Sequence, residues 1–404
     1  MSEAFSRIRQ LLGEHGIERD ATGLPRAVPD STAAVAAVIT MANELQWRVR
    51  VEGHGTWLPS DAPADLVISL KGLEWLSSLT PADLVGTVGA GVPMDTLGLH
   101  LGEEGMWLAI DSPGRSDRTL GSVIATGTSG PLRLGFGPVR DHVLGCTVVT
   151  GDGKVIEAGG RVVKNVAGFD LTKLQVGGFG GFGIITELHL RLRARAGADV
   201  TVLARGKRDN LLIVARGIRE SSMQPAAMEL MSPALAASPD WVLALRFIGA
   251  EEAVHADREQ LPLEPGVSWE VIPAGQSGSF RTITGMASLV GSVTIRLGAL
   301  VGGLDDTLDL VASELGEGFL SAGAGDGTIR WTGEATPEQL SQLRRMAATR
   351  EIPLTVERAP WPVRSAVGHF GAYREGVGQL VDRLRETYDP LKVISVALEG
   401  REHE

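Results

Sequence analysis

The chain has 404 residues, 43% of them hydrophobic and 22% charged, and its net charge of −11 comes without a stripe of Lys or Arg. Binding to nucleic acid or to an anionic membrane requires a concentrated basic surface, so the composition argues against both partners. A chain of this length exceeds most single hydrophobic cores, so we expect two domains. We see no secretory signal and no apolar run of membrane-spanning length, and we expect a cytoplasmic protein without direct membrane insertion.

The predicted elements of the first half are short strands and helices. Ser31 and Thr32 precede a run of strong helix formers that ends at Ala42, which is the pattern of an N-capped helix. Alternation of apolar and polar residues and the turn residues between them predict the remaining elements. These are strands at 47–51, 66–70, 84–89 and 184–192, a helix at 94–101, a helix or tight turn at 121–127, and a hairpin of 143–149 with 154–157.

Residues 193–198 mark the expected domain boundary, because the glycine clusters that fill residues 86–183 end there. The second half lacks these glycine clusters. Its residue pattern predicts strands at 241–247 and 292–296 and helices at 337–348 and 373–387. The sequence therefore predicts an α+β fold in two domains, residues 1–195 and 196–404.

Cysteine is nearly absent. Cys146 is the single one, within the apolar run 143–149, and we expect it to be a small buried residue of a strand. An iron–sulfur or structural zinc site needs several thiolates or imidazoles, so we predict no metal site. Redox chemistry in this chain would need an organic cofactor or the metal of a partner.

Glycine-rich segments suggest where such a cofactor binds. Gly53-His54-Gly55-Thr56 follows a predicted strand, and a turn of this kind exposes backbone N–H groups that suit a pyrophosphate; an ordinary turn is the alternative. No G-x-G-x-x-G opens a helix, which argues against a Rossmann domain, and Gly177–Gly183 leads into a strand instead. Small residues in 111–130 leave room for a large flat ligand against the backbone.

The ordered motifs resemble the FAD-binding domain of the vanillyl-alcohol oxidase / p-cresol methylhydroxylase (PCMH) family. The resemblance implies a PCMH-type FAD-binding domain of two α+β subdomains, followed by a smaller α+β C-terminal domain with an antiparallel sheet. The pieces that carry it are GHGT (53–56), GAG (89–91), SPGRSDRTLGSVIATGTSG (112–130), VRDHVLG (139–145), KNVAGFDLTKL (164–174) and GGFGGFGIITE (177–187).

The resemblance also implies a residue-level FAD site. FAD is expected to be bound non-covalently, because Gly55 stands where relatives that link FAD through this loop carry a His. For Thr119 and Thr128, a simple turn or cap role is the alternative. Gly53, His54, Gly55, Thr56 and Trp57 would wrap the pyrophosphate; Pro113, Thr119, Gly121, Ser122, Ala125, Thr128 and Gly130 would line the ribityl chain and flavin; Gly178, Gly183 and Ile185 would bracket the adenine.

Within this family the chain is most similar to the accessory FAD-binding subunit of bacterial glycolate oxidase, on residues 129–145 and 161–174. That similarity implies a subunit of a 2-hydroxy-acid (glycolate- or D-lactate-like) dehydrogenase or oxidase complex, active in flavin-mediated electron transfer. The expected partners are a larger FAD-binding catalytic subunit and an Fe–S subunit, one of which would bring the chain to the inner membrane as a peripheral protein. Two alternatives stay open: a stand-alone flavin oxidase or dehydrogenase of a small hydroxy acid, and a non-catalytic assembly subunit.

The sequence identifies no catalytic base. Residues 323–327 lack the His expected of the catalytic subunit, and the C-terminal residues 394–400 depart from the family's ending. His369, flanked by glycine and apolar residues, is the candidate base, with a buried structural histidine as the alternative. Arg133 and Arg140 lie either near the flavin or in an ion pair with Asp141.

Overall fold

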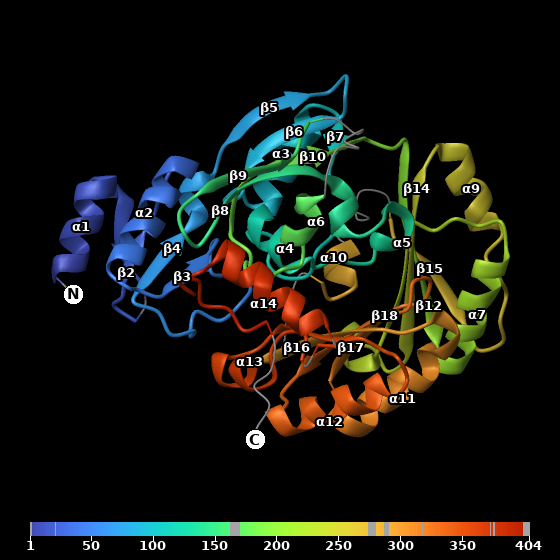
Figure 1. Cartoon of the computed structure of the whole chain (residues 1–404). Helices are drawn as coiled ribbons and strands as arrows, with labels where there is room; N and C mark the ends of the chain where they lie inside the picture. Colours follow the sequence, from blue (N-terminus) through green and yellow to red (C-terminus); the bar gives the residue numbers. More distant parts are fainter. Residues whose placement is uncertain are drawn as a thin grey trace.

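The computed structural model describes residues 2–20, 22–161, 170–273, 280–286, 291–316, 318–371, 373–374 and 376–398. Two halves lie against each other, the first coloured blue to green and the second lime to red in Figure 1. Each half buries its own hydrophobic core: Ile39, Leu66 and Leu188 belong to the first, and Leu243, Ile295 and Trp331 to the second.

The first half opens with a four-stranded sheet of order β1-β2-β4-β3, in which β4 pairs in parallel with β2 and β3. The predicted helix is present, and Ser31 caps it by accepting a hydrogen bond from the backbone N–H of Ala34. The elements are α1 (Ser2–Leu12), β1 (Ile17–Arg19), β2 (Pro25–Ala27), α2 (Thr32–Glu44), β3 (Val49–Glu52) and β4 (Leu66–Ser69).

A second, antiparallel sheet of order β5-β6-β10-β8-β9 completes this half. The predicted hairpin is β8 with β9, and Cys146 in β8 is 2% exposed, as expected of a small core residue. The elements are β5 (Leu76–Thr80), β6 (Val85–Gly89), α3 (Met94–Glu103), α4 (Leu120–Thr126), α5 (Arg133–Phe136), β8 (Val143–Val149), β9 (Val155–Gly159), α6 (Leu171–Gln175) and β10 (Ile184–Arg191), with a small pair of β7 (Met106–Trp107) and β11 (Arg193–Ala194).

The second half is built on one eight-stranded antiparallel sheet of order β15-β12-β14-β13-β17-β18-β16-β19. Its strands are β12 (Ala198–Gly206), β13 (Ala227–Met231), β14 (Trp241–Gly249), β15 (Ser268–Val271), β16 (Val293–Gly298), β17 (Phe319–Gly323), β18 (Thr328–Gly333) and β19 (Leu354–Arg358). Its helices are α7 (Arg208–Glu220), α8 (Pro233–Ala236), α9 (Glu251–Glu259), α10 (Phe280–Ile283), α11 (Leu304–Leu315), α12 (Pro337–Ala348), α13 (Trp361–Val367) and α14 (Val377–Tyr388). The α+β fold and the antiparallel sheet of the second half are thus confirmed.

The end of the described chain returns to the first half. The backbone N–H of Val49 in β3 donates to the carbonyl of Val393, and the N–H of Ser395 donates to the carbonyl of Val49. Val393 and Ile394 are buried in the first core. Residues 393–395 therefore complete the edge of the first sheet beside the loop that follows β3. Within the described ranges, no helix combines the length and apolar character needed to cross a bilayer.

Candidate functional site

A cavity lies where the loop after β3, helix α4 and the glycine-rich turn before β10 meet the second half of the chain. Its free volume is about 140 Å³, below the roughly 300–1,000 Å³ of typical small-molecule pockets. Of the predicted site residues, those that line it are Gly53, His54, Gly55, Thr56, Trp57, Thr119, Gly121, Ser122, Ala125, Gly183, Ile185 and the candidate base His369.

The loop after β3 has the geometry expected of an anion-binding turn. Gly55 has φ of +67°, which favours glycine, and it is exposed. Gly53 has no room for a side chain, because a Cβ there would overlap Thr119. Two buried cations, Arg50 and Arg364, also line the cavity, and each is paired with an Asp at 2.6–2.7 Å.

Helix α4 carries the next group of predicted residues. Thr119 is its N-cap, and the side-chain oxygen accepts from the N–H of Ser122, so the cap role that the sequence left open is present. Gly121 approaches the end of β6: its N–H donates to the carbonyl of Ala90 at 2.8 Å, and a Cβ would lie 2.8 Å from the Ala90 side chain. The glycine is therefore required by packing inside the first half.

The predicted adenine end is only partly in the cavity wall. Gly183, with φ of +131°, and Ile185 line the cavity, whereas Gly178 is buried outside it. Phe179, which the sequence analysis did not select, lines the cavity and stacks on the ring of His369 at 3.8 Å.

Of the seven residues predicted to line the ribityl chain and flavin, four line the cavity and three lie outside it. Pro113, Thr128 and Gly130 are buried but do not line the cavity. The side chain of Arg118, fully buried, fills the space between them: Nη1 donates to the Pro113 carbonyl at 2.7 Å and Nη2 to the Thr128 hydroxyl at 2.8 Å. Arg118 thus occupies the space beside two of the residues predicted to line the ribityl chain and flavin, Pro113 and Thr128. In the sequence, Arg118 is one of two arginines, with Arg115, among the small residues of 111–130.

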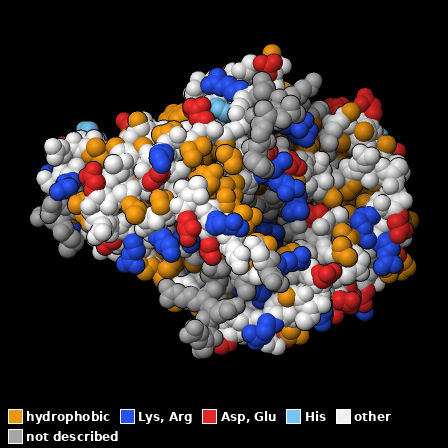
Figure 2. Space-filling model, viewed as in Figure 1, with side chains coloured by type: hydrophobic (Ala, Val, Ile, Leu, Met, Phe, Trp, Pro, Cys, Tyr) orange, Lys and Arg blue, Asp and Glu red, His pale blue; other side chains and the backbone are white. Residues whose placement is uncertain are grey.

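Arg133 and Arg140 both take part in ion pairs. Arg133 lies 3.5 Å from Asp326 of the second half, and Arg140 lies 3.5 Å from Asp141, one of the two arrangements that the sequence allowed. Lys and Arg side chains gather near the middle of the face shown in Figure 2, between the two halves.

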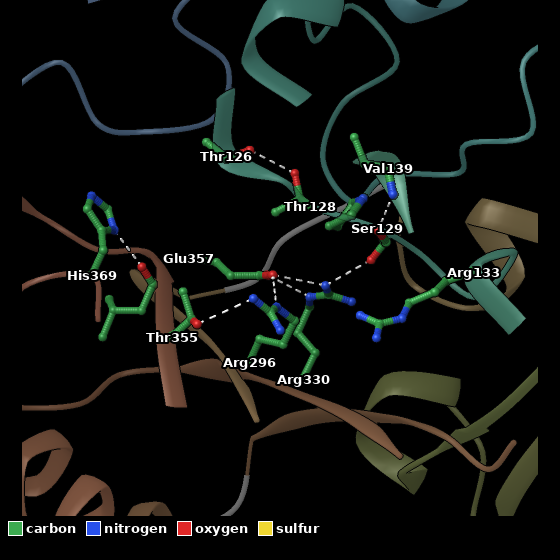
Figure 3. Close-up of polar contacts among 12 residues, drawn as sticks. Thr126, Thr128, Ser129, Arg133, Val139, Arg296, Arg330, Thr355, Glu357 and His369 are labelled. Carbon is green, nitrogen blue, oxygen red and sulfur yellow. Dashed lines mark hydrogen bonds and ion pairs between the residues drawn. The ribbon is translucent and has the colours of Figure 1, made fainter. Parts of the chain in front are cut away.

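A buried charge cluster joins the two halves of the chain beside this site (Figure 3). Glu357 in β19 is 1% exposed and accepts from Arg330 at 2.7 Å and from Arg296 at 2.9 Å. Burial alone would raise the pKa of Glu357, but Arg330 and Arg296 hold it below its ordinary value. Arg330 also donates to the carbonyl of Ser129 in the first half at 3.1 Å. Residues 323–327, where a catalytic His was expected of relatives, comprise the last residue of β17 and the turn to β18.

His369 has the environment of a structural histidine. It is 1% exposed, and Nδ1 lies 2.6 Å from the carbonyl oxygen of Val356, to which the neutral ring can donate (Figure 3). Burial lowers the pKa of His369 to about 3. An imidazole with that pKa is a poor proton acceptor near neutral pH, because a general base works best with a pKa near the operating pH.

Comparisons with known proteins agree with this architecture. Residues 26–159 match the FAD binding domain family. The glycolate oxidase subunit GlcE of Escherichia coli is 35% identical over 189 residues, which are 45% of this chain and 50% of that protein. The D-lactate dehydrogenase of Archaeoglobus fulgidus is 31% identical over 232 residues, which are 56% of this chain and 52% of that protein. The chain thus spans about half the length of these relatives.

Solved structures extend the likeness to the whole chain at the level of the fold. The 4-ethylphenol oxidase of Gulosibacter chungangensis superposes with a TM-score of 0.73 at 13% identity, covering 100% of this chain and 98% of that one. An alkyldihydroxyacetonephosphate synthase gives a TM-score of 0.71 at 13% identity, covering 100% of this chain and 85% of that one. Residues 26–159 are accordingly similar to FAD binding domains, and the whole chain shares the fold of the 4-ethylphenol oxidase and of the alkyldihydroxyacetonephosphate synthase.

Proposed function

We propose that this chain is the FAD-binding accessory subunit of a 2-hydroxy-acid dehydrogenase complex, with glycolate- or D-lactate-like substrates oxidised on a larger partner subunit. FAD would be held non-covalently by the loop 53–57, by α4 and by the turn before β10. The observation that carries the proposal is the combination of this loop and cavity with a second half whose one histidine at the cavity, His369, is buried and neutral.

The partners follow from the same chemistry. Oxidation of an alcohol needs a proton acceptor, and general-base help contributes about 10²–10⁴-fold. Electrons that reach a flavin here have no metal to pass to within the described residues, where no cluster of metal-ligating side chains occurs. A larger flavoprotein subunit and an Fe–S subunit would supply both functions. The similarity to a glycolate oxidase subunit of Escherichia coli supports a multi-subunit assembly.

Dye-linked turnover tests the proposal directly. The lone chain and the assembly co-purified with its neighbours are compared with glycolate and D-lactate. We expect the lone chain to be slower by at least about 10²-fold, the lower end of what a general base contributes. Turnover by the lone chain within a few-fold of the assembly would instead favour a stand-alone hydroxy-acid dehydrogenase, and His369→Ala would then test its base.

A second candidate function is supported by one observation. Arg118 fills the space beside Pro113 and Thr128, two of the residues expected to line the ribityl chain and flavin, and this suits a subunit that keeps the fold for assembly more than for electron transfer. An assembly whose activity survives when this chain is purified free of flavin and added back would favour that function.

A further inference from the structure

We propose that Arg118 and Trp57 form a plug that closes the flavin-ring half of the cavity, so that the resting chain recognises the ADP portion of FAD and admits the ring only when the plug opens. This inference rests on the FAD site proposed above and adds its specificity determinant. The two residues come from different segments, the pyrophosphate loop and the loop before α4, and both are at most 4% exposed.

The side chain of Arg118 occupies the space beside several residues predicted to line the flavin. Nε donates to the Ser122 hydroxyl at 3.2 Å, and Nη2 donates to the hydroxyls of Thr126 and Thr128 at 2.6 and 2.8 Å. The guanidinium plane also lies against the Trp57 ring, 3.7 Å from its centroid. Pro113, Ser122 and Thr128, all predicted to line the ribityl chain and the ring, are therefore already occupied by one side chain. A planar ring could take the same place only if the guanidinium left it.

Arg118 differs from the other buried arginines of the described residues in having no carboxylate partner. Arg50, Arg330 and Arg364 each have a carboxylate within 2.7 Å, whereas Arg118 donates only to neutral oxygens among the described residues. A buried cation without an ion pair is costly to desolvate. Glu357 attracts Arg118 electrostatically, but its ion pairs are with Arg296 and Arg330. Its position depends on hydroxyl and carbonyl contacts that a ligand can replace.

Trp57 is buried with one polar atom left unsatisfied by the described part of the chain. Its indole Nε1 is buried and has no hydrogen-bond partner among the described residues. An unsatisfied buried donor disfavours the conformation that contains it. Gly114, with φ of +105°, leaves the room that the pair occupies, since a Cβ there would lie 3.1 Å from the Trp57 ring and 3.3 Å from the Arg118 stem. The plug is thus a packed arrangement without an ion pair to any described residue, beside the cavity that Trp57 and Ser122 also line.

Comparing FAD with ADP-ribose, which has the same diphosphate but no flavin, isolates the contribution of the flavin ring to binding. The dissociation constants of FAD and of ADP-ribose are measured by calorimetry on flavin-free wild type, Arg118→Ala and Trp57→Ala. Both ligands carry the same diphosphate diester. The loss of the positive charge of Arg118 should therefore affect both dissociation constants equally and cancel in their ratio. The matched control is Arg115→Ala, which removes an arginine from the same loop that is 70% exposed and paired with Asp117.

We expect wild type and Arg115→Ala to bind the two ligands with dissociation constants within a few-fold of each other. In Arg118→Ala and Trp57→Ala, FAD should become tighter than ADP-ribose by at least about ten-fold, the factor that one good ring-stacking contact supplies. Iodide quenching of the flavin fluorescence checks the same point, because the ring should be accessible in wild type and protected in the variants.

Wild type that binds FAD a hundred-fold more tightly than ADP-ribose, with the ring protected from iodide, would overturn the plug while leaving the FAD site intact. Lower FAD selectivity in Arg118→Ala than in wild type would also overturn it, since Arg118 would then be a contact of the ring. If wild type binds neither ligand, the proposed FAD site itself is wrong. Should Arg118→Ala fail to fold, Arg118→Met keeps an apolar side chain of similar length. The ratio of its dissociation constants for FAD and ADP-ribose then tests the plug in the same way.

Discussion

Replacing Glu357 by Gln removes the carboxylate on which two arginines of the second half depend. Arg330 is 5% exposed at its side chain and Arg296 is 26% exposed, and their nitrogens lie 2.7 and 2.9 Å from the two Glu357 oxygens. Without the carboxylate, two cations on the adjacent strands β16 and β18 would face each other across an uncharged amide. Breaking a buried pair by removing one partner typically costs about 3–5 kcal/mol of unfolding free energy, and we expect Glu357→Gln to fall in that range.

Removing Arg330 instead should cost less. Glu357 would keep Arg296 as a partner at 2.9 Å, so Arg330→Met leaves no unpaired charge in the cluster. The control is Glu270→Gln, which breaks the pair of Arg205 with Glu270 on β12 and β15, with side chains 36% and 53% exposed. An exposed pair contributes about 0.2–1 kcal/mol.

The assay is equilibrium denaturation with urea, read by tryptophan fluorescence and by circular dichroism, since two cores can unfold in separate transitions. Trp331 lies in the core of the second half and reports on it. A loss below about 1 kcal/mol for Glu357→Gln, equal to the exposed control, would refute the reasoning that this cluster is buried and mutually dependent. So would a larger loss for Arg330→Met than for Glu357→Gln.

Three further predictions concern the cofactor and pH. FAD that co-purifies with the chain should be released by acid or heat, and a yellow colour that stays with the precipitated protein would contradict the non-covalent site. Gly55→Asp should abolish FAD uptake without unfolding the chain, because it brings a like charge to the pyrophosphate at an exposed turn; stoichiometric FAD in this variant would show that the site is misplaced. Burial raises the pKa of Glu229 from 4.5 to about 8, so its stabilising contribution is complete below pH 4.5 and is lost as the pH rises toward 8. Unfolding free energies of Glu229→Gln and wild type should therefore diverge in favour of the variant by a few kcal/mol between pH 5 and 8, at ~1.4 kcal/mol per pKa unit, and parallel curves would contradict it.

The local pattern of the sequence was sufficient for much of the first half. Ser31 caps α2 because its hydroxyl accepts from an N–H three residues along, an interaction within one turn. The hairpin of β8 and β9 follows from a short turn between two apolar runs, and Gly55 takes the positive φ that a tight loop demands. These features depend on neighbouring residues, so composition and spacing reveal them.

Only the tertiary structure decided which residues meet at the site. Arg118 reaches Trp57 because two loops fold over one another, and Glu357 meets Arg296 because strands 61 residues apart in sequence pair in one sheet. His369 could be a base or a core residue on sequence grounds, and its burial against Val356 and Phe179 selects the core residue. Such contacts join segments with no shared periodicity, and the free energy that stabilises them comes from burial and charge pairing that form only in the folded chain.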